Sequence, residues 1–100
     1  MKESKIDDSC RICATAVGKG AEIREFCTIH DSDIGEECRI YERVSLKKCT
    51  IGKGAEINAG TYIEFTQIGD DVQIGPNCSI VGVFHEMTDK GVTKIGRAHV

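Results

Sequence analysis

The side chains best suited to proton transfer stand next to each other in a polar segment near the end of the chain. His85 and Glu86 occupy it, and imidazole is the side chain that titrates nearest to neutral pH. Such a histidine can act as a general base that removes a proton from a hydroxyl or an amine. Glu86 is the candidate for orienting the ring, although neighbouring residues on an extended chain point to opposite sides. We therefore take His85 and Glu86 as the candidate catalytic residues, with an incidental surface histidine as the alternative.

Six cysteines are the other side chains with chemistry of their own. Cys13 directly follows Ile12 and is expected to point outward, which makes it the one candidate for a reactive thiol. A covered position at a subunit contact is the alternative. The other five cysteines occupy regularly spaced positions and are expected to be buried as small apolar side chains.

The elements that position these residues are predicted by a repeat of aliphatic residues. Their spacings are 6, 6 and 5, so the true period is 17. Helices and amphipathic strands have periods of 3.6 and 2 and do not produce this pattern. The aliphatic residues that carry it are Ile6, Ile12, Val17, Ile23, Ile29, Ile34, Ile40, Leu46, Ile51, Ile57, Ile63, Ile68, Ile74 and Ile80.

A chain wound as a triangular coil produces a period of 17 in three steps, each a short strand and a turn. Residues 17 apart then stack in three columns at the parallel-strand spacing of about 4.8 Å. Each coil satisfies most of the main-chain hydrogen bonds of its neighbours. Small residues, including the five regular cysteines, fall at the corners, and Cys10 lies directly below Cys27, where a disulfide is conceivable but not implied. Glycine follows the third column at Gly18, Gly35, Gly52 and Gly69, where we expect a special backbone or a close approach.

Composition and charge exclude several classes of function. With 13 Lys and Arg against 16 Asp and Glu, the net charge of −3 leaves no basic surface for nucleic acid. One hundred residues make a single domain, residues 1–100. The first residues lack the apolar stretch of a signal peptide, and no apolar run approaches the roughly 18–20 residues that cross a membrane. We expect a soluble protein of the cytoplasm.

The coil pattern is interrupted once, after Ile80. The next Ile-Gly pair is expected at position 85 but stands at Ile95 and Gly96, so ten residues are inserted. The pattern predicts coils over 6–80, an extruded loop over 81–94 and a partial coil over 95–100. His85 and Glu86 lie in that loop, and loops on a regular scaffold concentrate function.

The pattern aliphatic-Gly-x-x-small-x, seen at residues 51–57 and 68–78, resembles that of the hexapeptide-repeat acyltransferases. The resemblance covers residues 6–80 and is closest to the branch that acetylates sugars and nucleotide sugars. It implies an all-β, left-handed parallel β-helix of about five coils, with acetyl-CoA as the acyl donor and His85 as the general base. It also implies that Lys94 and Arg97 contact the phosphates of coenzyme A, although a solubilising role explains these two residues equally well. Three parallel prisms are expected to form a homotrimer.

Two other functions of such a scaffold are not expected. A metal site on the pattern of γ-class carbonic anhydrases is not expected, because His30 and the root of the loop lie about three coils, or roughly 14 Å, apart. Outward rows of charged residues do not suit ice binding. The chain ends at Val100, partway through a coil, so a truncated acyltransferase without its coenzyme site and a non-catalytic trimeric binding or scaffold module both remain open.

Overall fold

The computed structural model describes residues 3–82, which form fourteen short strands in three parallel sheets. The first face consists of β1 (Lys5–Ile6), β4 (Glu22–Ile23), β7 (Arg39–Ile40), β10 (Glu56–Ile57) and β13 (Gln73–Ile74). The second face consists of β2 (Arg11–Cys13), β5 (Thr28–His30), β8 (Ser45–Lys47), β11 (Tyr62–Glu64) and β14 (Ser79–Val81). The third face consists of β3 (Ala16–Val17), β6 (Asp33–Ile34), β9 (Thr50–Ile51) and β12 (Gln67–Ile68).

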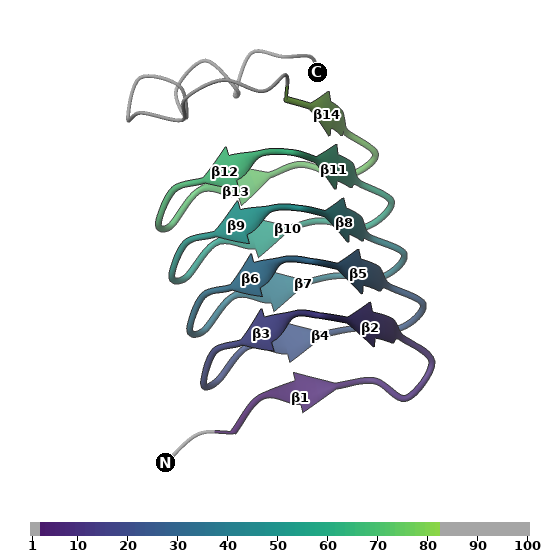
Figure 1. Ribbon diagram of the computed structural model, residues 1–100, viewed down its shortest axis with the longest axis vertical. Helices are drawn as coiled ribbons and strands as arrows, with labels where there is room; N and C mark the ends of the chain where they lie inside the picture. Colours follow the sequence, from purple (N-terminus) through teal and green to yellow (C-terminus); the bar gives the residue numbers. More distant parts are fainter. Residues whose placement is uncertain (1–2, 83–100) are drawn as a thin grey trace.

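The register confirms the period of 17. Ile6 pairs with Ile23, Ile12 with Ile29 and Val17 with Ile34, and every later pair keeps the same offset. The three aliphatic columns therefore stack inside a triangular prism, which Figure 1 shows from the side. Columns of β-branched residues suit this geometry, because their side chains pack well on a pleated surface.

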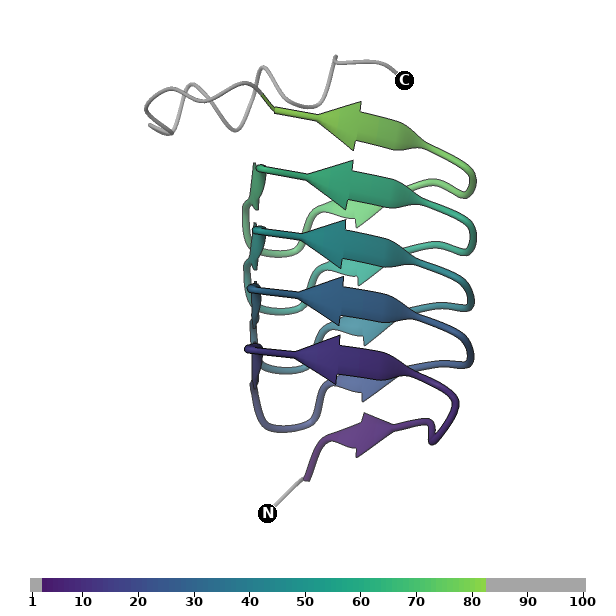
Figure 2. The ribbon, with the colours of Figure 1, turned by 45° about the vertical axis from the view of Figure 1, so that its right-hand side comes forward.

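The prism is a left-handed β-helix. As the chain climbs from its N-terminus, the strands of the second face run leftward across the front of Figure 1, and those of the first face return rightward behind them. Figure 2 shows the same sense of winding. A chain that climbs while moving leftward in front turns in the left-handed sense, as the hexapeptide resemblance implied.

The core is built from the columns and the small corner residues. Seventeen apolar residues are buried, from Ala21 to Ile80, together with Ser32, Thr61 and Thr66. Cys27, Cys38 and Cys49 are at most 2% exposed, which confirms the prediction for three of the five regular cysteines. Cys10 and Cys78 lie in the outermost coils and are only half-buried, because fewer coils cover them.

Apart from the tip positions Ser9 and Gly82, each corner of the described coils turns on one residue with a positive φ. We name the corner between the first and second faces the first corner, with tips at Phe26, Arg43, Gly60 and Asn77. The second corner, between the second and third faces, has tips at Ala14, Asp31, Lys48 and Phe65. The third corner has tips at Gly20, Glu37, Gly54 and Asp71.

The left-handed conformation is uncommon for residues other than glycine, yet nine such residues adopt it here. The tip N–H groups are paired with the preceding coil: Lys48 donates to the carbonyl of His30 at 3.0 Å, and Phe65 donates to that of Lys47 at 2.9 Å. These bonds satisfy main-chain groups at the turns and offset the cost of the conformation.

The glycines after the third column are explained by close approach. A Cβ on Gly35 would lie 2.7 Å from the carbonyl carbon of Gly52, and one on Gly18 would lie 2.6 Å from the amide nitrogen of Glu36. Neither glycine has a positive φ. The coils are packed so tightly at this edge that no side chain fits between them.

Candidate functional site

The four residues predicted to carry chemistry, His85, Glu86, Lys94 and Arg97, lie outside the described residues. The structure instead defines the place from which that segment begins. One part of the predicted boundary is corrected, since Val81 was assigned to the extruded loop but belongs to β14 and pairs with Glu64. Val81 therefore belongs to the fifth strand of the second face.

The regular corner geometry ends at Gly82. This residue occupies the position of Phe65 one coil later, and its N–H donates to the carbonyl of Glu64 at 2.9 Å, as a corner tip should. Its φ is not left-handed, unlike that of the four tips below it. A Cβ at this position would collide with the carbonyl oxygen of Phe65. Gly82, three residues before His85, is therefore the first tip position of the second corner without the left-handed conformation.

Side chains near Gly82 form a small polar and aromatic group. The Tyr62 hydroxyl donates to Oε1 of Glu64 at 2.6 Å, and this hydrogen bond raises the pKa of Tyr62. The Nζ of Lys48 lies 5.2 Å from the centre of the Phe65 ring, within the range of a cation–π contact. Sequence analysis found neither interaction. Lys48 and Phe65 meet because the register stacks residues 17 apart, whereas Tyr62 and Glu64 lie on the same side of one strand, two residues apart.

The buried thiols are held by main-chain carbonyls. Cys27 donates to the carbonyl of Tyr41 at 3.0 Å, and Cys49 donates to that of Ile63 at 3.3 Å. Burial raises the pKa of each of these two thiols to about 11, because the charged thiolate is poorly solvated inside the prism. Both thiols are thus inert at neutral pH.

Cys10 and Cys13 form a Cys-x-x-Cys spacing that the sequence analysis missed, and the structure separates their side chains. The thiol of Cys10 points inward and donates to the carbonyl of Arg24 at 2.8 Å, whereas Cys13 is exposed on the second face. Both are free thiols, as is Cys27, so the conceivable disulfide between Cys10 and Cys27 is not formed. The outward orientation predicted for Cys13 is confirmed, and its reactivity stays a prediction.

His30 is the one histidine among the described residues 3–82. His30 is half-buried on the second face, between Cys13 on one neighbouring strand and Lys47 on the other. In this part of the chain no three His, Cys, Asp or Glu side chains gather closely enough to hold a metal ion. The same residues contain no helix long and apolar enough to cross a membrane.

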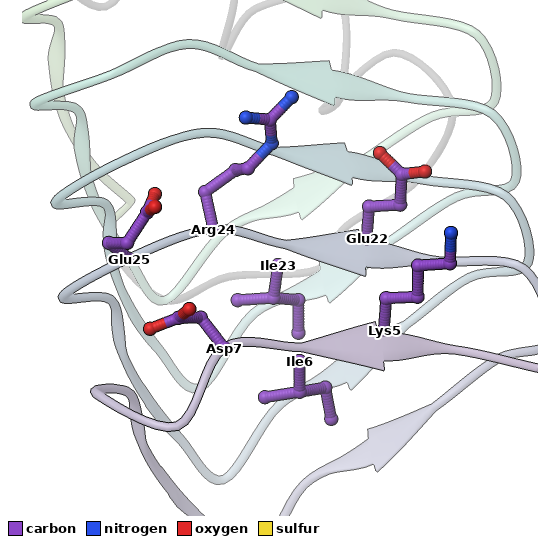
Figure 3. A pocket seen from close by; sticks show the side chains of 7 residues that line it. All are labelled: Lys5, Ile6, Asp7, Glu22, Ile23, Arg24 and Glu25. Atoms are coloured by element: carbon purple, nitrogen blue, oxygen red, sulfur yellow. The ribbon is translucent and has the colours of Figure 1, made fainter.

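Two open hollows lie on the first face near the N-terminal end. The larger, of about 410 Å³, is lined by seven residues of β1, β4 and the following turns, which Figure 3 shows. Lys5 and Glu22 stand above one another on its rim, and they also line the second hollow, of about 280 Å³. Ile6 is 41% exposed at its base, so the larger hollow is the end of the aliphatic core where the first coil is least covered.

Triangular coils of 17 residues, aliphatic columns, small corners and left-handed winding together define a hexapeptide-repeat β-helix domain. Within this class, the chain belongs to the family of the GMPPB C-terminal domain, whose family model matches residues 15–93. That match spans the regular coils and the segment that contains His85. No curated protein matches the chain.

Solved structures that align with part of this chain include structures described as GDP-perosamine N-acetyltransferase. PerB from Caulobacter crescentus, in complex with CoA and GDP-perosamine, aligns with a TM-score of 0.43 and 20% identity over 80% of this chain. The H141A mutant of GDP-perosamine N-acetyltransferase from the same organism aligns with a TM-score of 0.41 and 17% identity, also over 80% of this chain. This chain spans about half of their length, 51% and 50%. A putative acetyltransferase from Bacillus cereus aligns with a TM-score of 0.32 and 20% identity, over 96% of this chain and 85% of that one.

Proposed function

We propose that this protein transfers an acetyl group from acetyl-CoA to a sugar, a nucleotide sugar or a similar small acceptor in the cytoplasm. The observation that carries the proposal is that Gly82, the last described residue, lacks the left-handed conformation of the other second-corner tips. The coil keeps its register from β1 to β14 and then loses its corner geometry three residues before His85. The hexapeptide resemblance of residues 6–80 supports the acyltransferase class.

The proposed roles follow from the side chains. His85 removes the proton from the acceptor hydroxyl or amine as that atom attacks the thioester carbonyl of acetyl-CoA. The acetyl group moves to the acceptor, and coenzyme A leaves as its thiol. Glu86 orients the imidazole of His85. Lys94 and Arg97 bind the phosphates of the coenzyme through charge-assisted hydrogen bonds.

Replacement of His85 tests the assignment. His85→Ala should lower the turnover of acetyl-CoA with a competent acceptor by about 10²–10⁴-fold, the usual contribution of a general base. Binding of acetyl-CoA, followed by calorimetry, should stay within a few-fold of wild type. His30→Ala is the matched control, because it removes an imidazole from the second face without changing the segment after Gly82. Equal turnover in His85→Ala and wild type would refute the role of His85.

A second candidate is a homotrimeric binding or scaffold module without catalysis. The observation that favours it is a set of exposed apolar side chains on the second face and its corners, Tyr62, Phe65 and Val81, at 39%, 42% and 55% exposure. Such groups are typical of contacts with another protein surface. Calorimetry with acetyl-CoA separates the two candidates: micromolar binding near one site per chain supports the enzyme, and a folded trimer that does not bind it supports the module. Both candidates include the homotrimer.

A further inference from the structure

Cys10 and Cys27 form the one pair of interior cysteines in residues 3–82 that lie directly above one another. Each follows a tip position of the first corner, and the two are one period of 17 residues apart. Cys38 and Cys49 lie at the other two corners, and Cys78 lies at the first corner three coils higher. Residues stacked in parallel strands are about 4.8 Å apart, which is within the Cα separation of roughly 4.4–6.8 Å that a disulfide spans.

Hydrogen bonds between the first two coils hold the pair in place. The N–H of Arg11 donates to the carbonyl of Cys27 at 2.9 Å, and the N–H of Phe26 donates to Oγ of Ser9 at 2.9 Å. The first of these bonds joins the residue after Cys10 to Cys27 itself, and the second joins the residues that precede the two cysteines. The backbone therefore sets the separation that a disulfide needs before any sulfur reacts.

The sulfur of Cys10 already points toward the coil of Cys27. It donates to the carbonyl of Arg24 at 2.8 Å, and Arg24 precedes Cys27 by three residues in that coil. Burial is the main cause of the raised pKa of Cys27, and interaction with the thiol of Cys10 adds to it. Cys27 itself donates to the carbonyl of Tyr41 at 3.0 Å. Thiols are weak donors, so little is lost when a bond between the two sulfurs replaces these two contacts.

The two thiols differ in their access to solvent, and this difference sets the order in which they react. Cys10 is half-buried in the outermost coil, whereas Cys27 is only 1% exposed. A reagent dissolved in water therefore reaches Cys10 first, and Cys27 stays inert toward it. An oxidised sulfur on Cys10, however, lies against Cys27, and groups held in contact react far faster than dissolved ones.

We propose that Cys10 and Cys27 are a redox-sensitive pair that hydrogen peroxide converts into a disulfide between the first two coils. The Cys10 sulfur attacks one peroxide oxygen, the O–O bond breaks, and a sulfenic acid and water are formed. The Cys27 sulfur then attacks the Cys10 sulfur, the S–S bond forms, and the S–OH group leaves as water with the thiol proton of Cys27. Two thiols thus give two electrons to one peroxide. This inference does not rest on the proposed function.

The disulfide cross-links the least covered coil to its neighbour. Ile6 is 41% exposed, and Ile12 and Val17 are only partly buried. A cross-link between residues 17 apart restricts the chain when this coil opens. The amides of Lys5 and Arg11, which donate to the second coil, should therefore exchange with deuterium at least about tenfold more slowly in the oxidised protein. Dithiothreitol should restore the original rates.

Peptide mapping after mild oxidation tests the pair. The full chain carries Cys13→Ser, which removes the exposed thiol, and it is treated with hydrogen peroxide, quenched with catalase and then unfolded in urea with iodoacetamide. Trypsin places Cys10 in residues 6–11 and Cys27 in residues 25–39. These two peptides should be linked, and fragmentation of the linked species should place the bond at position 27 rather than 38.

Cys78 is the matched control within the same chain. It is also half-buried at the first corner, but its neighbour in the coil below is Thr61, whose Oγ1 accepts from the N–H of Cys78 at 3.2 Å. Cys78 should form no disulfide. In Cys27→Thr, Cys10 should stop at the sulfenic acid, which dimedone traps. The fold accepts this variant because Thr61 already occupies the same column and donates to the carbonyl of Gly75 at 2.9 Å.

Three outcomes would overturn the inference. One is a Cys10 that stays a thiol, or that stops at the sulfenic acid while Cys27 is present. Another is a disulfide to Cys78, or one that forms only in the urea-unfolded chain, because either shows that stacking in the native prism does not select the partner. The last is an unchanged exchange rate at Arg11 in the linked protein, which would overturn the stabilisation of the first coil.

Discussion

At the scale of single residues, the exposure of each cysteine depends on its place in the prism. Position alone predicted which cysteines point inward, and the coil in which each lies decided how completely it is covered. Cys27 and Cys49 have neighbouring coils on both sides and are at most 2% exposed. Cys13, one strand position away from the interior row, is exposed. Inside and outside therefore differ by a single residue step, as expected for a strand.

This contrast predicts a wide spread in thiol reactivity. In the native protein at pH 8, Cys13 should react with iodoacetamide at the rate of an exposed thiol. Cys27 and Cys49 should react at least about a hundredfold more slowly, because burial raises the pKa of each thiol to about 11 and only the thiolate is the nucleophile. Mass spectrometry of peptides after timed alkylation measures this, with the urea-unfolded protein as control. Equal labelling of Cys13 and Cys49 in the native protein would contradict the assigned burial.

At the scale of elements, the glycines after the third column are needed for coil contact. Gly35→Ala should destabilise the protein by about 1–3 kcal/mol, the usual cost of overpacking, because the new Cβ would lie 2.7 Å from the backbone of Gly52. Gly75→Ala is the matched control, since a Cβ there meets nothing within 4 Å. Urea unfolding followed by circular dichroism gives both values. A loss at Gly75 as large as that at Gly35 would show that close approach is not the cause.

The corners are the element that sequence reasoning described least well. Small residues at the interior corner positions predicted where the chain turns, but not that the tip residues adopt a left-handed φ. Lys48 and Phe65 are poor candidates for that conformation by residue type. At both tips the N–H donates to a carbonyl of the preceding coil, a bond that exists only when the coils are stacked.

At the scale of the whole molecule, stability should vary along the prism axis. Each coil contacts only its neighbours, so a residue in the middle coils is covered on both sides and one in the first coil is not. Ile57→Ala should cost about 2–5 kcal/mol, the range for removing a buried isoleucine, because Ile57 is fully buried. Ile6→Ala should cost less than half as much, since Ile6 is 41% exposed. Equal losses in urea titrations of the two variants would show that the N-terminal end is covered in solution.

The sequence by itself determined the β-helix, its columns and most of its interior. That was possible because stacked coils repeat one local pattern, so the spacing of Ile23, Ile40 and Ile57 already states which residues pair. Spacing alone left open the handedness, the tip conformations and the exposure of Cys10 and Cys78, because these depend on backbone angles and on neighbouring coils. For the candidate site, the sequence supplied His85 and its segment. Only the tertiary structure showed that Gly82 lacks the left-handed tip conformation. It also brought Tyr62, Phe65 and Val81 to one surface, because β11 and β14 become neighbours only when the chain has closed a coil.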